Sequence, residues 1–273
     1  MTPAYTILGA SGFIGQHLAR AIAAAGGTCF MPGRDAPEIF ERDLGRVIYC
    51  IGLTADYRRR PLDTVQAHAG YLARVLEQAR FDKLVYLSST RLYDTLPPGT
   101  YAEETVLRMD PADPRHLYDL SKALGENLCL TTSGGRASVA RLSCVYAQAA
   151  GSPGFLSDVL ARLRHTRTLH VDSSSGYVRD YIHVDDVVRA LLRILDQPAP
   201  GIYNVACGEN LSNRALADLL QTHGFTLTLA RESAAQPAPV CDVAKLRHVL
   251  EVAPITVGTF LSRYLAEIGH EPD

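Results

Sequence analysis

The sequence predicts an α/β protein in which helices cover both faces of a doubly wound parallel sheet. Two observations predict this fold class. Short apolar runs alternate with helical patterns through the first half of the chain, and the first apolar run ends in a glycine-rich turn that opens a helix. The chain has 273 residues, of which 47% are hydrophobic, so it can bury the core of one large domain with a smaller lobe.

The elements of the first half follow from this alternation. A strand is expected over 5–8, and apolar residues at helical spacing then predict a helix over 12–25, which Gly26 and Gly27 end. Further strands are expected at buried apolar runs, over 28–31, 47–51, 84–87 and 138–142. Helices are expected where apolar residues share one face, over 65–79 and over 118–131.

Beyond Ala147 the regular alternation weakens. Helices are expected over 156–163, 185–195 and 213–221, and short strands over 177–184 and 202–205. We therefore expect a single domain over 1–273, with the main sheet mainly in 1–147 and a small α/β lobe mainly in 148–273.

Composition excludes several classes of protein. The formal net charge is −2 and no basic block occurs, which argues against a nucleic-acid partner. No apolar run reaches the roughly 18 residues of a membrane span, and no signal peptide is evident. The six cysteines lack C-x-x-C spacing and any neighbouring metal-ligand pattern, so we expect reduced thiols, no metal and a cytoplasmic protein.

Gly9, Gly12 and Gly15 follow the first strand and open the first helix. In this context the spacing is typical of a dinucleotide-binding turn: the first glycine permits a tight turn, the second lets the pyrophosphate approach the backbone, and the third lets helix and strand pack closely. Free N–H groups at the helix start favour the phosphates. The sequence thus predicts a Rossmann-type core in 1–147, with cofactor contacts from Gly9, Ser11, Gly12, Phe13, Ile14 and Gly15. The alternative is an ordinary strand–turn–helix.

The end of the second strand bears on the choice of cofactor. A carboxylate at this place pairs with the ribose hydroxyls of NAD, whereas this chain has Gly33 followed by Arg34. A guanidinium can pair with a 2′-phosphate, so the sequence favours NADP(H). Asp35 could still reach the ribose, which leaves NAD(H) open, and Arg34 could also be an ordinary surface arginine.

Tyr118 and Lys122 lie four residues apart on a predicted helix, hence on one face. A nearby ammonium stabilises a phenolate and so lowers the pKa of a tyrosine, which makes the phenol a usable general acid or base. Ser88, Ser89 and Thr90 end a buried strand at the edge where α/β sheets bind ligands. Together these residues predict transfer of a hydride and a proton between a nicotinamide cofactor and an alcohol or ketone.

At this point the sequence resembles the extended short-chain dehydrogenase/reductases, the NAD-dependent epimerase/dehydratase group that acts on nucleotide sugars. The resemblance covers nearly the whole chain. Its motifs are the glycine turn, the segments 86–93 and 118–122, the arginine-led segment 141–146, and the segments 179–186 and 202–208.

The resemblance implies a role for each matching residue. The catalytic residues would be Ser89, which holds the reacting oxygen, Tyr118, which exchanges the proton, and Lys122, which tunes Tyr118; Tyr118 and Lys122 would also contact the cofactor. Arg179 would grip the diphosphate of the nucleotide sugar. The expected substrate contacts are Ser89, Thr90, Cys144 and Arg179. The resemblance also implies that the protein can form a homodimer through the helices that include Tyr118.

Three departures from the family pattern matter. Only about twelve residues separate the second strand from Val47, so one βα unit is expected to be missing and the adenine contacts to differ. Thr90-Arg91 stands where sugar 4,6-dehydratases carry an Asp-Glu pair directly after the catalytic Thr or Ser, which argues against 4,6-dehydration. Cys144 stands where an asparagine usually contacts the substrate; we expect it to be a buried small residue rather than a nucleophile.

The function expected from the sequence is therefore an NAD(P)-dependent oxidoreductase of a nucleotide-activated sugar. Two reactions fit: 4-keto reduction, which Gly33-Arg34 favours slightly, and 4-epimerisation. A hypothesis from another class is a catalytically inactive dinucleotide-binding sensor or scaffold. Such proteins tend to lose the catalytic tyrosine or lysine, and this chain keeps both Tyr118 and Lys122.

Overall fold

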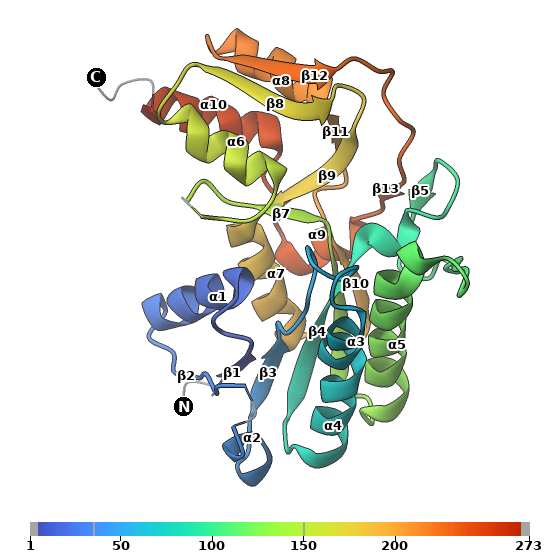
Figure 1. Ribbon diagram of the computed structural model, residues 1–273. Helices are drawn as coiled ribbons and strands as arrows, with labels where there is room; N and C mark the ends of the chain where they lie inside the picture. The colour runs from blue at the N-terminus through green and yellow to red at the C-terminus, as the bar shows by residue number, and fades with distance from the viewer. Residues whose placement is uncertain (1–4, 35, 150, 269–273) are drawn as a thin grey trace.

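The computed structural model describes residues 5–34, 36–149 and 151–268. Its centre is a six-stranded parallel sheet, which confirms the predicted fold class (Figure 1). In spatial order its strands are β10 (Ile202–Val205), β6 (Ala137–Leu142), β4 (Lys83–Ser89), β3 (Arg46–Tyr49), β1 (Tyr5–Leu8) and β2 (Cys29–Phe30).

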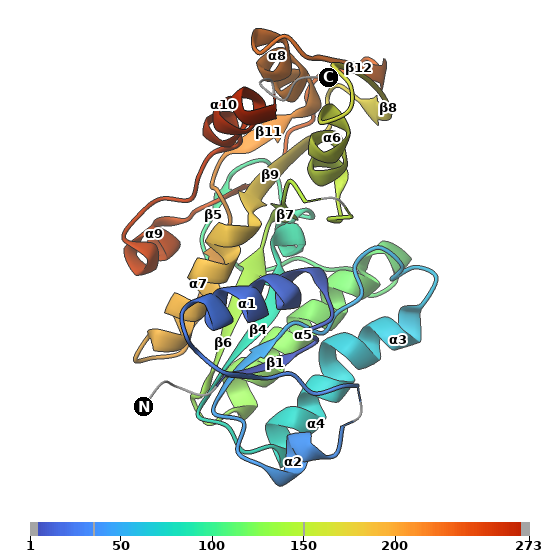
Figure 2. The ribbon, with the colours of Figure 1, turned by 90° about the vertical axis from the view of Figure 1, so that its left-hand side faces the viewer.

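Helices cover the two faces of this sheet, as the views in Figures 1 and 2 show. One face carries α1 (Phe13–Ala24) and α7 (Val184–Asp196); the other carries α3 (Pro61–Val65), α4 (Tyr71–Gln78) and α5 (Leu117–Thr132). Successive strand residues point to opposite faces, so Ile7 packs with Leu18 and Leu191 in one core, while Leu8 packs with Leu72 in the other. The continuous apolar strands in the sequence reflect this burial on both sides.

The predicted loss of one βα unit is confirmed at the edge of the sheet. The two-residue strand β2 is the last strand in the order, and β1 pairs with β3 on its other side. Between β2 and β3 the described residues form only one helical turn, α2 (Glu38–Glu41). The short connection leaves no room for a further strand and helix.

A second group of elements stacks at one end of the sheet, at the top of Figure 1. It contains the sheet β11 (Asn210–Ser212), β9 (Val178–His183) and β7 (Cys144–Tyr146), and the parallel pair β12 (Thr226–Arg231) and β8 (Thr168–Ser174). Around a shared apolar core lie α6 (Phe155–Leu163), α8 (Asn213–Thr222) and α10 (Val257–Ile268). Sequence reasoning found α6, α8 and β9 but missed the other strands and α10.

The chain passes between the two groups more than once. Helix α7 packs on α1, and β10 pairs with β6 in the main sheet, although both lie beyond residue 147. Helix α9 (Ala244–Leu250) packs on α7, and β13 (Val240–Cys241) pairs with β5 (Thr100–Tyr101). The upper group is therefore assembled from separate stretches of chain. Within the described residues no helix is long and apolar enough to cross a membrane.

Candidate active site

The predicted site residues gather at the carboxyl ends of neighbouring parallel strands, where α/β sheets place their ligands. Gly9 follows β1, Gly52 follows β3, and Ser89 ends β4. Because β3 lies between β1 and β4, the glycine turn and the serine stand on either side of Gly52.

The glycine turn has the shape that its spacing predicts. Gly9 adopts a φ of 89°, a left-handed conformation that favours glycine. A Cβ atom at Gly15 would lie 2.5 Å from the Gly9 carbonyl oxygen, so only glycine lets α1 pack this close to the turn. Gly12 is the N-cap of α1 and supplies no side-chain cap to the helix N–H groups, which are therefore left to an anionic ligand. These features fit the pyrophosphate of a dinucleotide.

The other expected cofactor contacts lie around this turn. Ser11 is exposed, Phe13 and Ile14 are half-buried in the first turn of α1, and Arg34 is exposed beyond β2. Asp35, the alternative ribose ligand, lies outside the described residues.

Ser89 and Tyr118 meet at the end of β4. Tyr118 lies in the first turn of α5 and is 3% exposed, and the side-chain hydroxyls of Ser89 and Thr54 lie close enough to act on its phenol. Burial raises the pKa of Tyr118, while these two hydroxyls and the charge of Arg91 oppose the rise. The phenol is thus protonated at neutral pH and able to donate its proton.

Lys122 directs its ammonium group to the backbone of β4. Its Nζ donates to the carbonyl oxygen of Leu87 at 2.7 Å, and the cation that acts on the Tyr118 phenol is Arg91, whose guanidinium carbon lies 4.6 Å from the ring centroid. Burial lowers the pKa of Lys122 to about 7. Helical spacing places the two side chains on one face but does not say where each head group finds its partner, so the tuning of Tyr118 by Lys122 stays a prediction.

His68 is a buried neighbour of Tyr118 and Lys122 that sequence reasoning missed. It lies in a π-helical segment, Gln66–Gly70, and its ring meets that of Tyr118 edge-on with centroids 5.1 Å apart. Nε2 accepts from the Leu53 N–H, so Nδ1 carries the proton and donates to Ser121 Oγ at 2.8 Å. Burial and the charge of Lys122 lower the pKa of His68 to about 3, so the ring stays neutral. The π-helical interruption marks the position of His68, but the spacing of apolar residues in the sequence does not reveal such an interruption.

Ser88 precedes the catalytic candidate Ser89 on β4, and its side chain points to the opposite face of the strand. Its hydroxyl donates to Glu126 Oε1 at 2.6 Å, and the same carboxylate makes two hydrogen bonds with the Arg141 guanidinium at 2.9 and 2.7 Å. Glu126 and Arg141 are almost fully buried. This pair joins α5, which carries Tyr118, to the centre of the sheet.

A cavity of about 610 Å³ opens beside Tyr118. Arginines dominate its lining, which consists of Arg58, Arg91, Asp94, Thr95, Arg108, Met109, Asp110, Arg115, His116, Asp119 and Arg179. Arg179 reaches it from β9, with its guanidinium 3.7 Å from the Asp94 carboxylate and 4.5 Å from the centre of the Tyr177 ring. The excess of arginine suits a phosphorylated ligand.

The two remaining substrate candidates, Thr90 and Cys144, lie near this cavity. The exposure of Cys144 differs from the expectation. The Thr90 hydroxyl donates to the Leu142 carbonyl at 3.4 Å. Cys144 is exposed rather than buried, because it begins the edge strand β7. The surrounding protein still raises the pKa of its thiol to about 11, so the sulfur is protonated at neutral pH and is a poor nucleophile.

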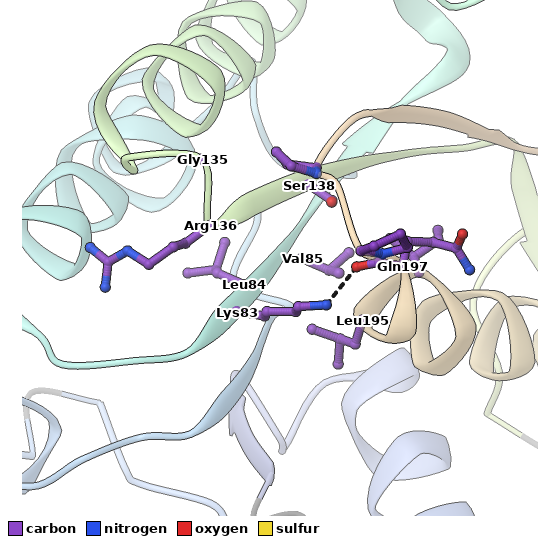
Figure 3. A pocket seen from close by; sticks show the side chains of 11 residues that line it. Lys83, Leu84, Val85, Gly135, Arg136, Ser138, Leu195 and Gln197 are labelled. Carbon is purple, nitrogen blue, oxygen red and sulfur yellow. Dashed lines mark hydrogen bonds between the residues drawn. The ribbon is translucent and has the colours of Figure 1, made fainter.

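A second, smaller cavity lies at the other end of the sheet, between the start of β4 and the end of α7 (Figure 3). Its volume is about 20 Å³, and the Lys83 Nζ donates there to the Gln197 carbonyl at 2.5 Å. It has room for about one water molecule, so it does not compete as a ligand site. Among the described residues, no cluster of three histidine, cysteine or acidic side chains could hold a metal ion.

Comparison with known proteins agrees with this geometry. Residues 5–206 match the model of the NAD dependent epimerase/dehydratase family. The chain is 30% identical over 250 residues to GDP-6-deoxy-D-mannose reductase of Pseudomonas aeruginosa, covering 81% of this chain and 80% of that protein. It is 29% identical over 250 residues to dTDP-6-deoxy-L-talose 4-dehydrogenase (NAD(P)(+)) of Kitasatospora kifunensis, covering 78% and 77%.

Solved structures show the same fold. RMD from Pseudomonas aeruginosa complexed with NADPH superposes with a TM-score of 0.75 at 25% identity, covering 98% of this chain and 99% of that one. MoeE5 in complex with UDP-glucose and NAD gives a TM-score of 0.77 at 20% identity, covering 96% and 97%, and supports the fold alone. From its motifs, its fold and the match over 5–206, the chain belongs to the NAD dependent epimerase/dehydratase family.

Proposed function

We propose that the protein is an NAD(P)-dependent oxidoreductase of a nucleotide-activated sugar, working by 4-keto reduction or 4-epimerisation. The observation that carries the proposal is the buried Tyr118 phenol beside Ser89, at the strand edge that also holds the glycine turn, next to the arginine-lined cavity. Matched relatives are named as a reductase and a dehydrogenase of nucleotide sugars, and these names support the same chemistry.

Residues of the Rossmann-type core would hold the dinucleotide. Residues 1–147 would bind mainly the cofactor, and residues 148–273 mainly the substrate. Its proposed contacts are Gly9, Ser11, Gly12, Phe13, Ile14, Gly15, Arg34, Tyr118 and Lys122. When bound, its nicotinamide supplies or accepts a hydride at the sugar carbon. Ser89 would orient the sugar oxygen, and Tyr118 would give that oxygen its proton or take it away. Lys122, fixed on the Leu87 carbonyl, would bind the cofactor.

The nucleotide diphosphate would occupy the arginine-lined cavity. Arg179 is its proposed ligand, because a guanidinium can offer two parallel N–H groups to phosphate oxygens. Ser89, Thr90 and Cys144 would line the path from the diphosphate to Tyr118. The exposed Cys144 leaves room for the sugar where it enters.

The experiment that tests this function is mass spectrometry of the small molecules released from the denatured protein, followed by titration of the empty protein with NADPH and NADH. Uptake of NADPH in preference to NADH, with consumption of NADPH when a 4-keto sugar nucleotide is added, is the expected result for a reductase. Stoichiometric release of NAD would point to the epimerase and against NADP(H). A protein that binds neither dinucleotide would overturn the proposal.

The NADP(H) preference makes a separate prediction at Arg34. Replacing Arg34→Ser removes the guanidinium proposed for the 2′-phosphate, so the Kd for NADPH should rise roughly tenfold while the Kd for NADH changes less than about twofold. Fluorescence titration of the reduced cofactors measures both values. Arg193→Ser, the same change on an exposed stretch of α7, is the matched control. Equal changes for both cofactors, or none, would contradict the preference.

A further inference from the structure

The cavity beside Tyr118 holds a carboxylate whose role the proposed reaction does not explain. Asp119 is 4% exposed and lines the cavity. Its Oδ1 atom is buried without a hydrogen-bond partner among the residues that the structure describes. Buried polar atoms are nearly always hydrogen-bonded, because leaving one unpaired costs free energy. On the wall of the cavity, this acceptor is available to a ligand.

Arg91 faces this carboxylate from the turn that follows Ser89. Its Nε atom lies 3.8 Å from Asp119 Oδ1, beyond hydrogen-bond distance. Its guanidinium is fixed between two rings, with its central carbon 4.6 Å from the centroid of Tyr118 and 5.2 Å from that of Tyr57. A cation and a carboxylate thus form a long ion pair next to the Tyr118 phenol, without a direct hydrogen bond between them.

We propose that Asp119 and Arg91 form a subsite that binds a neutral hydroxyl group of the substrate's sugar and rejects a sugar that carries a carboxylate there. This Asp119–Arg91 subsite rests on the proposed function and specifies its substrate class. A hydroxyl group can donate to Asp119 Oδ1 and accept from the Arg91 guanidinium at the same time. It would bridge the gap that the two side chains leave open.

Neither charged alternative fits both side chains. A sugar carboxylate has no proton to donate to Asp119 and would place two like charges close together, which is unfavourable. An amino group protonated to an ammonium would pair with the Asp119 carboxylate but would be repelled by the Arg91 guanidinium. Only a group that both donates and accepts suits the pair, and a sugar hydroxyl is such a group.

The charges around Asp119 decide how the subsite responds to pH. Arg91 and Asp94 face it from the turn after β4, and His116 and Tyr118 from the start of its own helix; Arg58, Arg115 and Arg179 share the cavity. Burial raises the pKa of Asp119 to about 6, against the opposing charge of Arg91. The carboxylate is therefore ionised at pH 8 and becomes protonated as the pH falls through about 6. Rejection of a sugar carboxylate should weaken over the same range.

Calorimetry on the dinucleotide-loaded protein at pH 8 tests the subsite. The probes are three matched pairs: UDP-glucose with UDP-glucuronate, dTDP-glucose with dTDP-glucuronate, and GDP-mannose with GDP-mannuronate. For the nucleotide that binds best, the neutral hexose should bind at least about tenfold more tightly than its uronate. The ratio of the uronate Kd to the hexose Kd should shrink at pH 5.5. The variant Asp119→Asn should weaken hexose binding by roughly tenfold and bring the ratio close to one at both pH values.

Controls separate the subsite from folding and from the proposed function. Asp158→Asn makes the same change on the exposed face of α6 and should alter neither affinity nor ratio. Dinucleotide affinity should be unchanged in Asp119→Asn, which shows that the variant is folded. Arg91→Lys should weaken hexose binding, since an ammonium lacks the planar guanidinium.

Two results would overturn the subsite and leave the proposed function standing: a uronate that binds as tightly as its hexose, or an Asp119→Asn variant with the wild-type ratio. Failure of all six probes to bind a protein that holds its dinucleotide would overturn the proposed substrate class and the subsite with it.

Discussion

The variant Tyr118→Phe is expected to lose about 10³-fold in kcat while its Kd for the dinucleotide stays within about twofold of the wild type. The substitution removes the phenol oxygen beside the Ser89 and Thr54 hydroxyls and keeps the ring that packs on His68 and Arg91. Steady-state turnover of a sugar nucleotide, together with cofactor titration, measures both quantities.

The matched control is Tyr203→Phe, which removes the hydroxyl of a buried tyrosine on β10 in the main core. It should retain wild-type turnover. A Tyr118→Phe variant that turned over normally would contradict the catalytic role of the phenol and revive the hypothesis of a cofactor-binding sensor. Equal losses in both variants would point to a general effect on folding instead.

The protonation of Tyr118 bears on the role that its phenol can take. Burial raises the pKa of its phenol, so the folded protein holds Tyr118 as a proton donor at neutral pH. Donation to the sugar oxygen is the step that ketone reduction requires, whereas alcohol oxidation requires the phenolate. A phenol that is protonated beforehand can act as the acid in ketone reduction, and the phenolate left behind can act as the base in the reverse step.

The second large effect is expected at the buried ion pair beneath the site. Replacing Glu126→Leu leaves the Arg141 guanidinium buried without its carboxylate and removes the acceptor of the Ser88 hydroxyl. Breaking a buried pair in this way costs about 3–5 kcal/mol of the free energy of unfolding, because the remaining charge stays desolvated. Urea denaturation followed by circular dichroism measures the loss.

The double variant Glu126→Leu/Arg141→Met should recover much of that stability, since it leaves no unpaired charge. Asp63→Asn breaks an exposed ion pair with Arg60 and should change the free energy of unfolding by less than about 0.5 kcal/mol. If Glu126→Leu were as stable as the wild type, or if the double variant were no better than the single one, the pair would not be a determinant of stability.

Sequence periodicity recovered the elements whose side chains are buried in a regular pattern. The helix α1 and the strands β1, β4 and β6 carry apolar residues at spacings of 3.6 or in continuous runs, so their positions agree with the structure within one or two residues. The edge strands β7, β11 and β13 were missed, because two or three residues are too few to show a period and their partners are distant in sequence.

In the site, too, some features could be predicted from the sequence and others could not. The order and spacing of Gly9, Ser89, Tyr118 and Lys122 were enough to predict a redox site at the carboxyl edge of a parallel sheet, because those motifs depend on local backbone geometry. The packing of Arg91 on the Tyr118 ring, the neutral tautomer of His68 and the open Oδ1 of Asp119 each depend on which side chains meet across different elements.

By itself, therefore, the sequence determined the fold class and the position of the glycine turn, and it predicted Tyr118 as the proton-transfer residue, since each follows from spacing along one or two adjacent elements. Only the tertiary structure decided which cation acts on Tyr118, where Lys122 directs its ammonium group and which charges line the cavity. Those features arise from burial and from distances between residues far apart in the chain, and burial is what sets the pKa of each buried group and leaves a polar atom open for a ligand.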